Sequence, residues 1–397
     1  MAGAHQALRG EIRGLTGLRL VAAVWVVAHH FWLFSPDRDL LARLDPLRPL
    51  LASGWLGVDL FFVLSGFVLA HNYVAVLGNR FRGRAAVDFY RARISRIWPT
   101  WMVVLGAVLV GGHVQQALVG TPGGSAAEGL DAVTLLRQVL LVQVWDRPDY
   151  SATGPVGPGW SLSAEWLAYL AFPLLALLLH RVRSRRPVVP AALAVAALVP
   201  FAATCLVLGT HDWAWSWLLR LTGAFLAGSL AALAVARVDR GAAVERAAGR
   251  TAAAVLALLP VALWWAGAAG QDRAGAVALL FPVLVGALAL TDAGPARLLS
   301  TPLVVLGGRI SFALYLVHMA VFETLWTLAG AGSASAAGVL LQLGAPFLAA
   351  WVLWRFVEEP ARRRLRGAPA RRSAVPVPVA VPEPRAAAAD APVTSMA

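Results

Sequence analysis

The chain alternates long apolar runs with short polar stretches, and this alternation constrains its fold more than any other feature. A helix needs about 20 mostly apolar residues to cross the hydrocarbon core of a bilayer, and about ten runs meet that length. Apolar residues make up 59% of the chain and charged residues 14%. Soluble globular domains carry about 25% charged residues. The sequence therefore predicts an all-α polytopic membrane protein.

The predicted spanning helices lie near residues 14–34, 55–77, 97–118, 160–180, 188–209, 213–236, 251–270, 274–291, 303–328 and 337–357. A further apolar run, 133–145, is too short to span, and we interpret it as a re-entrant or interfacial segment. The single cysteine, Cys205, excludes an intramolecular disulfide and a cysteine-based metal site. We expect residues 1–366 to form one membrane domain and the Pro- and Ala-rich residues 367–397 to form a disordered tail.

Arginine placement predicts the orientation of the chain, because short cytoplasmic loops carry an excess of positive charge. Arginines precede the first predicted helix and cluster after the second, fourth, sixth and tenth. In the loop after the first helix, by contrast, aspartates offset the arginines. Both termini are therefore predicted to be cytoplasmic. The formal net charge of +13 follows from this topology, and we do not expect nucleic-acid binding.

The first apolar run carries a charged residue, Arg19, and two histidines, His29 and His30. A charge inside a membrane helix costs roughly 2.5–3.5 kcal/mol on insertion scales, so it marks a candidate functional site. Eleven residues separate Arg19 from His30. At about 100° and 1.5 Å per residue, the two side chains share one helix face and lie about 16 Å apart along the axis.

Four titratable side chains from four predicted helices fall at a similar depth in the outer half of the bilayer. They are His30, Asp59, Glu165 and His318. Each alone has an ordinary interpretation, since a membrane histidine often makes a helix–helix hydrogen bond and a carboxylate near the interface is tolerated. The shared depth favours one polar site, with His30 and Glu165 as its catalytic residues.

Further polar residues are candidates for the same site. Ser311, Tyr315 and His318 follow the i, i+4, i+7 spacing of one helix face. This line serves either as an intrahelical hydrogen-bond ladder or as part of the site lining. The supporting polar residues that we predict are Asp59, Ser161, Tyr315 and His318.

Three arginines, Arg91, Arg93 and Arg96, come just before the third predicted helix. Guanidinium groups suit phosphate recognition because their N–H groups form a planar fork. Any one of these arginines is more simply a topology signal. Three so close together, with Arg19 near the same surface, predict an anionic ligand on the cytoplasmic side.

These residues occur in segments that resemble acyltransferase family 3, bacterial integral membrane proteins that acylate cell-surface glycans and some secreted antibiotics. The segments are Arg19 with His30, GWLGVDLFFVLSGFVLA (54–70), FYRARISRIWPTW (89–101), GPGWSLSAEWLAYLAFP (157–173), ISFALYLVHMAVF (310–322) and VEEPARR (357–363). They follow the family's order from the first to the tenth predicted helix. One departure is Ala164, where valine is commoner, but Glu165 itself is kept.

The resemblance implies a location in a bacterial plasma membrane, a cytoplasmic acyl donor, acetyl-CoA or a related acyl-CoA, and a sugar hydroxyl as acceptor. We expect no metal. The residues that would bind the CoA phosphates are Arg19, Arg91, Arg93 and Arg96. His30 would accept the hydroxyl proton, and Glu165 would orient His30 or stabilise its charged form. Tyr315 or His318 would donate to the developing oxyanion. Direct transfer and a route through an acyl-histidine stay equally open.

Other hypotheses remain at this point. A macrolide or another secondary metabolite is an alternative acceptor, because the sequence shows no appended extracellular domain to select a polymer. A proton-coupled exporter of a polysaccharide or small molecule would explain the buried His and Glu residues, but not the arginine cluster. A membrane scaffold would leave so many titratable groups at one depth without a use. The oligomeric state is not predicted.

Overall fold

The computed structural model describes residues 11–119, 131–150, 154–183, 186–268, 273–329 and 335–365. Every regular element within these ranges is helical, which confirms the predicted all-α class. Nine helices within the same ranges are long and apolar enough to cross a membrane. The chain is therefore a multi-pass membrane protein. The predicted disordered tail, 367–397, lies outside the described residues.

The long helices that run without a break are α1 (Arg13–Phe34), α4 (Leu56–Leu77), α5 (Gly83–Val119), α7 (Gly159–Val182), α10 (Ser216–Val235), α11 (Ala242–Ala268) and α14 (Pro302–Ala329). Another span consists of α15 (Ala336–Leu353), a π-helical turn (Trp354–Glu358) and α16 (Glu359–Leu365). The short helices are α2 (Arg38–Leu44), α3 (Arg48–Ala52), α6 (Ala132–Leu140), α8 (Val188–Ala196), α9 (Val199–Leu208), α12 (Phe281–Ala289) and α13 (Pro295–Leu299).

Two predicted spans are interrupted. The span predicted at 188–209 divides into α8 and α9, with Pro200 in the first turn of α9, where its missing N–H is tolerated. The span predicted at 274–291 folds as a 3₁₀ helix, Ala274–Leu280, followed by α12, which begins with Phe281 and Pro282. It is shorter than the nine spanning helices.

Two helices begin earlier than the sequence predicted. α5 starts at Gly83 rather than near residue 97, so the arginine-rich segment is the first part of a helix and not a loop. α11 starts at Ala242 rather than near residue 251. Apolar length alone does not detect these extensions, because they carry arginines. The run at 133–145 forms the nine-residue α6 and then leaves helical geometry at Leu141, so it is too short to span, as predicted.

The most extensive helix pair joins α4 and α10, and glycines permit their close approach. A Cβ at Gly66 would overlap the carbonyl of Phe225, and one at Gly228 would overlap the carbonyl of Val63. Ser229 Oγ lies 3.2 Å from the Gly66 carbonyl oxygen across the interface. Small residues and cross-helix hydrogen bonds carry such contacts in membranes, because lipid tails are as apolar as the side chains.

α1 packs against α14 in a similar way. A Cβ at Gly308 would overlap the carbonyl of Thr16, so the two backbones touch. At one end of this pair, Arg13 Nη2 donates to the Ser300 carbonyl just before α14, at 2.9 Å. The contact continues toward the other end of both helices, where polar side chains from α1 and α14 meet.

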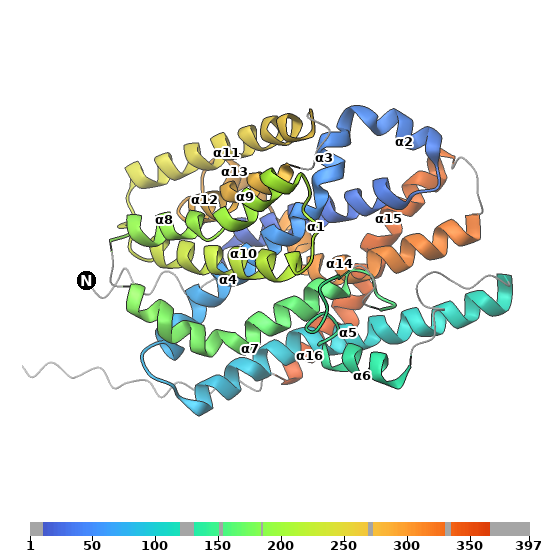
Figure 1. Cartoon of the computed structure of the whole chain (residues 1–397), viewed down its shortest axis with the longest axis horizontal. Helices are drawn as coiled ribbons and strands as arrows, with labels where there is room; N and C mark the ends of the chain where they lie inside the picture. Colours follow the sequence, from blue (N-terminus) through green and yellow to red (C-terminus); the bar gives the residue numbers. More distant parts are fainter. Residues whose placement is uncertain are drawn as a thin grey trace, which may run out of the picture.

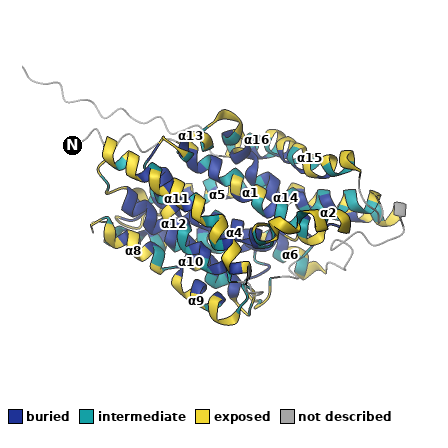
Figure 2. Cartoon of the chain, turned by 90° about the horizontal axis from the view of Figure 1, so that it is seen from above, coloured by how far each residue is buried: buried dark blue, intermediate teal, exposed yellow. Residues whose placement is uncertain are grey.

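The central and outer helices differ in what they expose. Figure 1 shows α1, α4, α10 and α14 within the bundle, with α11 along one edge and α5 and α6 along the opposite edge. Figure 2 shows exposed residues along the outer helices α8, α9, α11 and α15. Many of these are large and apolar, such as Val207, Trp264 and Leu340. An apolar outer surface of this kind fits a lipid environment rather than water.

Candidate active site

His30, near the end of α1, shares a hydrogen bond with His318 in α14. His30 Nδ1 lies 2.7 Å from His318 Nε2, and the two rings stack with centroids 5.0 Å apart. His318 is fully buried, and its Nδ1 lies 3.2 Å from the carbonyl oxygen of Leu314. A carbonyl can only accept, so Nδ1 of His318 must carry the proton. The Nε2 of a neutral His318 is then an acceptor.

This hydrogen-bond order also assigns the proton on His30. Because His318 Nε2 accepts, His30 Nδ1 must donate to it. A neutral His30 then has no proton on its Nε2. His30 is half-buried, whereas His318 is enclosed. The pair therefore presents one unprotonated imidazole nitrogen, on a ring whose orientation is held by its neighbour.

Glu165 of α7 has a different partner from the one predicted. Tyr169 Oη donates to Glu165 Oε1 at 2.6 Å, and Ser65 Oγ of α4 lies 3.1 Å from the same phenol oxygen. The side chain hydrogen-bonded to His30 is His318, and Glu165 makes no hydrogen bond to His30 in the described ranges. Helix packing brings α14 against the histidine-bearing part of α1, whereas Tyr169 lies four residues after Glu165 on the same face of α7.

Tyr315 and Ser161 bring two hydroxyl groups next to the histidine pair. Their oxygens lie 2.6 Å apart, and both lie 3.1 Å from the carbonyl oxygen of Pro158. The Tyr315 ring centroid is 6.0 Å from that of His318. In the tautomer described above, His318 Nε2 has no proton to donate. The predicted oxyanion donor is therefore Tyr315 rather than His318.

A narrow polar pocket lies between α1, α4, α5, α7 and α14. Arg19, Arg96, Glu165 and Tyr315 are among its lining residues, and its volume is about 40 Å³, room for a few water molecules. Arg19 also lines a second pocket of about 120 Å³, which reaches Glu11 before the start of α1. The two pockets thus share Arg19, with the hydroxyls beside the histidine pair at the far side of the first.

Two of the four predicted donor-binding arginines face this pocket. Neither Arg19 nor Arg96 makes a hydrogen bond to another residue in the part of the chain that the structure describes. The Arg19 guanidinium lies 5.6 Å from the centre of the Phe61 ring. Guanidinium groups with unused donors beside a polar pocket form an anion-binding arrangement.

The other two arginines lie elsewhere on α5. Arg93 is 5% exposed, and its guanidinium stacks near the rings of Tyr73, Phe89 and Tyr169 at 5.7–5.8 Å. It therefore supports the packing around the partner of Glu165. Arg91 is exposed and does not line the pocket. The difference follows from helix geometry, since five residues place Arg91 about 140° around the helix from Arg96.

Asp59 belongs to a separate cluster. Arg220 of α10 donates to its carboxylate through Nε at 3.0 Å and Nη2 at 2.8 Å, and both side chains are 1% exposed. The rings of Trp55 and Trp160 cover the guanidinium at 4.9 and 5.2 Å. Asp59 is therefore half of an ion pair between α4 and α10 and not part of the pocket. Arg220 was not predicted, although an arginine inside an apolar run signals a buried carboxylate partner.

Two further carboxylates lie near the pocket arginines and were not predicted. Glu11 Oε2 accepts from Arg309 Nη2 at 2.7 Å, and this hydrogen bond holds the pKa of Glu11 below its ordinary value. Glu358, 2% exposed in the π-helical turn, is close enough to Arg96 and Arg19 for their charges to interact. The VEEPARR segment was the available signal for Glu358. Within the described ranges, no group of three or more His, Cys, Asp or Glu side chains is placed to hold a metal ion.

Comparison with known proteins places the chain in a family. A family model described as an acyltransferase domain matches residues 12–355. The acyltransferase MdmB of Streptomyces mycarofaciens is 30% identical over 389 residues, which cover 89% of this chain and 92% of that protein. The O-acetyltransferase OatA of Staphylococcus aureus is 27% identical over 180 residues, which cover 43% of this chain and 26% of that protein.

The matched region contains the polar groups described above. It begins just before α1 and ends within the π-helical turn, so it includes both histidines of the pair and every residue named as lining the 40 Å³ pocket. No solved structure matches the chain significantly. Because the family model covers most of the chain and one relative aligns along nearly its whole length, the chain belongs to acyltransferase family 3 and is a membrane O-acyltransferase.

Proposed function

We propose that this enzyme transfers an acyl group, in the simplest case acetyl, from cytoplasmic acyl-CoA to a hydroxyl group of a carbohydrate. The observation that carries the proposal is the hydrogen-bond order from the Leu314 carbonyl through His318 to His30, which leaves Nε2 of His30 unprotonated. The unprotonated nitrogen of a neutral imidazole is suited to accept a hydroxyl proton.

The chemistry assigned to this pair is general base catalysis. The acceptor oxygen forms a bond to the thioester carbonyl carbon, and the carbon–sulfur bond breaks. Nε2 of His30 takes the hydroxyl proton and returns it to the departing CoA thiolate. His318 keeps the ring oriented through Nδ1 of His30, as the third group does in Ser-His-Asp sites. Tyr315, bonded to Ser161, is the donor nearest this pair for the negative charge on the carbonyl oxygen.

Donor binding is assigned to the pocket arginines. Arg19 and Arg96 have unused N–H groups suited to the phosphates of CoA. The eleven-position step from Arg19 to His30 corresponds to about 16 Å along α1, a distance that the extended pantetheine arm would cover. A pocket of about 40 Å³ is too small for that arm. Donor binding must therefore widen the pocket by moving apolar lining side chains such as Phe312.

The acceptor class follows from the family resemblance rather than from a contact. Acyltransferase family 3 includes enzymes that acylate glycans, so a carbohydrate hydroxyl is the proposed acceptor. If the acceptor is instead a macrolide hydroxyl, the reaction is still O-acylation and only the acceptor class changes. The exporter hypothesis has no support from membership in an acyltransferase family.

The test uses the full chain reconstituted in lipid nanodiscs with acetyl-CoA labelled on the acetyl group. We expect repeated turnover, with CoA thiol released beyond one equivalent of enzyme and label moved to a sugar acceptor, only when acceptor and enzyme are both present. A panel of oligosaccharides and hydroxylated macrolides identifies the acceptor class. Label that stays on the protein when acceptor is omitted would indicate an acyl-histidine, and its absence would indicate direct transfer. Repeated acetyl-CoA turnover without an acceptor would contradict the proposal. So would the absence of acyl transfer from every acyl donor.

A further inference from the structure

A groove of about 520 Å³ lies between α5, α14 and α15 with its π-helical turn, in residues that the mechanism does not use. We call it the α5–α14 groove. Apolar side chains such as Val104, Val317 and Val352 make most of its wall, and none of its lining residues lines the 40 Å³ pocket. Sites for small molecules have volumes of about 300–1,000 Å³. The groove is therefore a separate candidate binding site.

The polar lining residues of this groove lie toward one end. Glu323 and Thr324 come late in its α14 wall, and Gln115 is the last residue of its α5 wall. Because α5 and α14 run in the same direction through the bundle (Figure 1), both helices bring their polar lining residues to the same end. The topology predicted from the arginines places this end at the outer surface. The groove thus combines an apolar body with an acidic mouth.

The carboxylate of Glu323 has no partner in the part of the chain that the structure describes. It makes no hydrogen bond or ion pair there, and no other charged residue is among those that line the groove. The residue is nevertheless partly buried. A carboxylate within a membrane helix is costly unless it is paired, and it marks a functional site by default. The partner that this carboxylate lacks is a cation.

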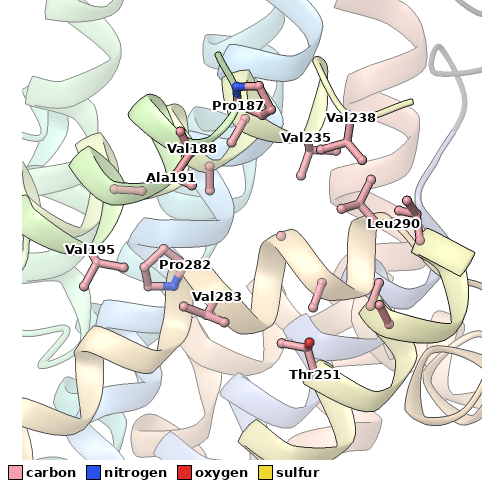
Figure 3. A pocket seen from close by; sticks show the side chains of 18 residues that line it. Pro187, Val188, Ala191, Val195, Val235, Val238, Thr251, Pro282, Val283 and Leu290 are labelled. Carbon is pink, nitrogen blue, oxygen red and sulfur yellow. The ribbon is translucent and has the colours of Figure 1, made fainter. Parts of the chain in front are cut away.

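A second groove, of about 440 Å³ between α8, α10, α11 and α12, offers a contrast (Figure 3). Its lining includes Val188 and Val195 of α8 and Pro282 of α12, and Thr251 supplies the one polar side chain among its lining residues. A groove that is apolar throughout accepts any hydrocarbon, membrane lipid included, so its lining does not select an occupant. The α5–α14 groove differs because its carboxylate selects for charge.

We propose that the α5–α14 groove binds an amphiphilic amine, a molecule with an apolar body and one basic nitrogen. The apolar body lies along the valine and alanine wall, and the protonated nitrogen donates a charge-assisted hydrogen bond to the Glu323 carboxylate. A phosphatidylethanolamine headgroup would bring a phosphate together with its ammonium group, and no cationic side chain is among the lining residues to receive that phosphate. A lone amine is therefore the better match.

The test compares two probes of similar shape, 1-pyrenebutylamine and the neutral 1-pyrenebutanol. Their affinities for the purified full chain in detergent are measured by native mass spectrometry. We expect the amine to bind about tenfold more tightly, as one charge-assisted hydrogen bond would give. Glu323→Gln should lower the affinity for the amine to that for the alcohol. Glu245→Gln, which changes an exposed glutamate of α11 that does not line the groove, is the control and should bind both probes as wild type.

A second set of variants tests the groove apart from its charge. Gly111 and Gly106 of α5 are both exposed, and a Cβ at either would meet no atom within 4 Å, but only Gly111 lines the groove. Gly111→Leu should weaken the binding of both probes, while Gly106→Leu should not. Ala191→Leu, which fills the groove of Figure 3, should also leave binding unchanged.

Three results would each overturn the proposal. Equal affinity of the wild type for the amine and the alcohol would leave the groove to membrane lipid. An equal loss of amine binding in Glu245→Gln would mean that the amine responds to overall charge. Unchanged amine binding in Gly111→Leu would place the amine outside the groove.

Discussion

The bundle contains two buried clusters of charged side chains, and they differ in whether the arginines are hydrogen-bonded to a partner. In the first, Asp59 and Arg220 form two hydrogen bonds with each other and are almost completely enclosed. In the second, Arg19 and Arg96 border a polar pocket without a hydrogen-bonded partner among the described residues, while Glu165 is bonded to Tyr169. Both clusters join several helices, so their position in the bundle does not explain the difference.

We propose that hydrogen-bond satisfaction separates the structural charges of the first cluster from the ligand-binding charges of the second. Removing an ion from water costs several kcal/mol unless a partner and further hydrogen bonds compensate. Arg220 has that compensation from Asp59 and two tryptophan rings, so the pair holds α4 against α10. Arg19 keeps unused donors, which an anionic substrate can satisfy. Five predictions test this distinction, from the largest expected effect to the smallest.

His30→Gln should have the largest effect on activity. Loss of a general base typically costs about 10²–10⁴-fold in rate, and we expect that loss in kcat/KM for acyl transfer, with an unchanged thermal midpoint. His29→Gln is the matched control, because His29 Nδ1 lies 2.8 Å from the Leu51 carbonyl and the residue has no assigned role in the chemistry. Equal losses in both variants would assign His30 a structural role.

Asp59→Asn should have the largest effect on stability. It leaves Arg220 as an uncompensated buried charge, which costs about 3–5 kcal/mol in unfolding free energy. Replacing both partners together, as Asp59→Leu with Arg220→Met, should recover most of that loss, since an apolar pair needs no compensation. Thermal unfolding in detergent measures both variants. A stable Asp59→Asn protein that had lost activity would assign Asp59 a functional role, like that of the second cluster, and not a structural one.

His318→Leu should lower kcat while leaving KM for the donor unchanged, because His318 acts through the orientation of His30. We expect a loss on the order of 100-fold, smaller than that of a catalytic carboxylate because His318 is neutral. His318→Gln keeps an amide oxygen that can accept from His30 Nδ1, and it should recover part of kcat. The pH dependence of kcat distinguishes the His318→Leu variant from the His318→Gln variant. Identical profiles for Leu and Gln would refute the positioning role.

Arg19→Gln and Arg96→Gln should each raise KM for acyl-CoA by about tenfold, as expected for loss of one charge-assisted hydrogen bond. Neither change should lower the thermal midpoint, because neither arginine has a hydrogen-bonded partner to abandon in the described part of the chain. Arg91→Gln, on the exposed side of α5, is the control and should behave as wild type. A fall in stability without a change in KM would place Arg19 with the structural charges.

Glu11→Gln should have the smallest effect, since the Glu11–Arg309 pair is largely exposed. Arg309 lowers the pKa of Glu11 in the folded state, so the pair stabilises the protein above the unfolded-state pKa. That contribution is lost as pH falls through the folded-state pKa. At pH 7 the free energy of unfolding of the wild type should exceed that of the variant by less than about 1 kcal/mol. The two free energies should become equal in acid. A difference that grew toward low pH would reverse this sign.

The helix limits were predictable where the bilayer alone decides them. The structure has α1 at Arg13–Phe34 and α14 at Pro302–Ala329, within two residues of the ranges expected from apolar length. The starts of α5 and α11 were predicted wrongly. Those extensions are polar, so the requirement for about 20 apolar residues does not apply to them.

Part of the candidate site was predictable because it lies along single helices. The common face of Arg19 and His30 follows from helical periodicity, and so does that of Tyr315 and His318. The hydrogen-bond partner of His30 did not follow from helical periodicity. Similar depth made Glu165 the expected neighbour of His30, but depth does not specify which faces of two helices meet.

The sequence by itself determined that the chain is an all-α membrane protein, which family it belongs to, and which side chains are available for acyl transfer. Only the tertiary structure decided that His30 bonds His318, that Asp59 bonds Arg220 and that Arg91 lies outside the pocket. The physical reason is the distance along the sequence over which each property is set. Apolar length and helical periodicity are local properties, whereas a hydrogen bond of about 3 Å between distant residues exists only after the helices have packed.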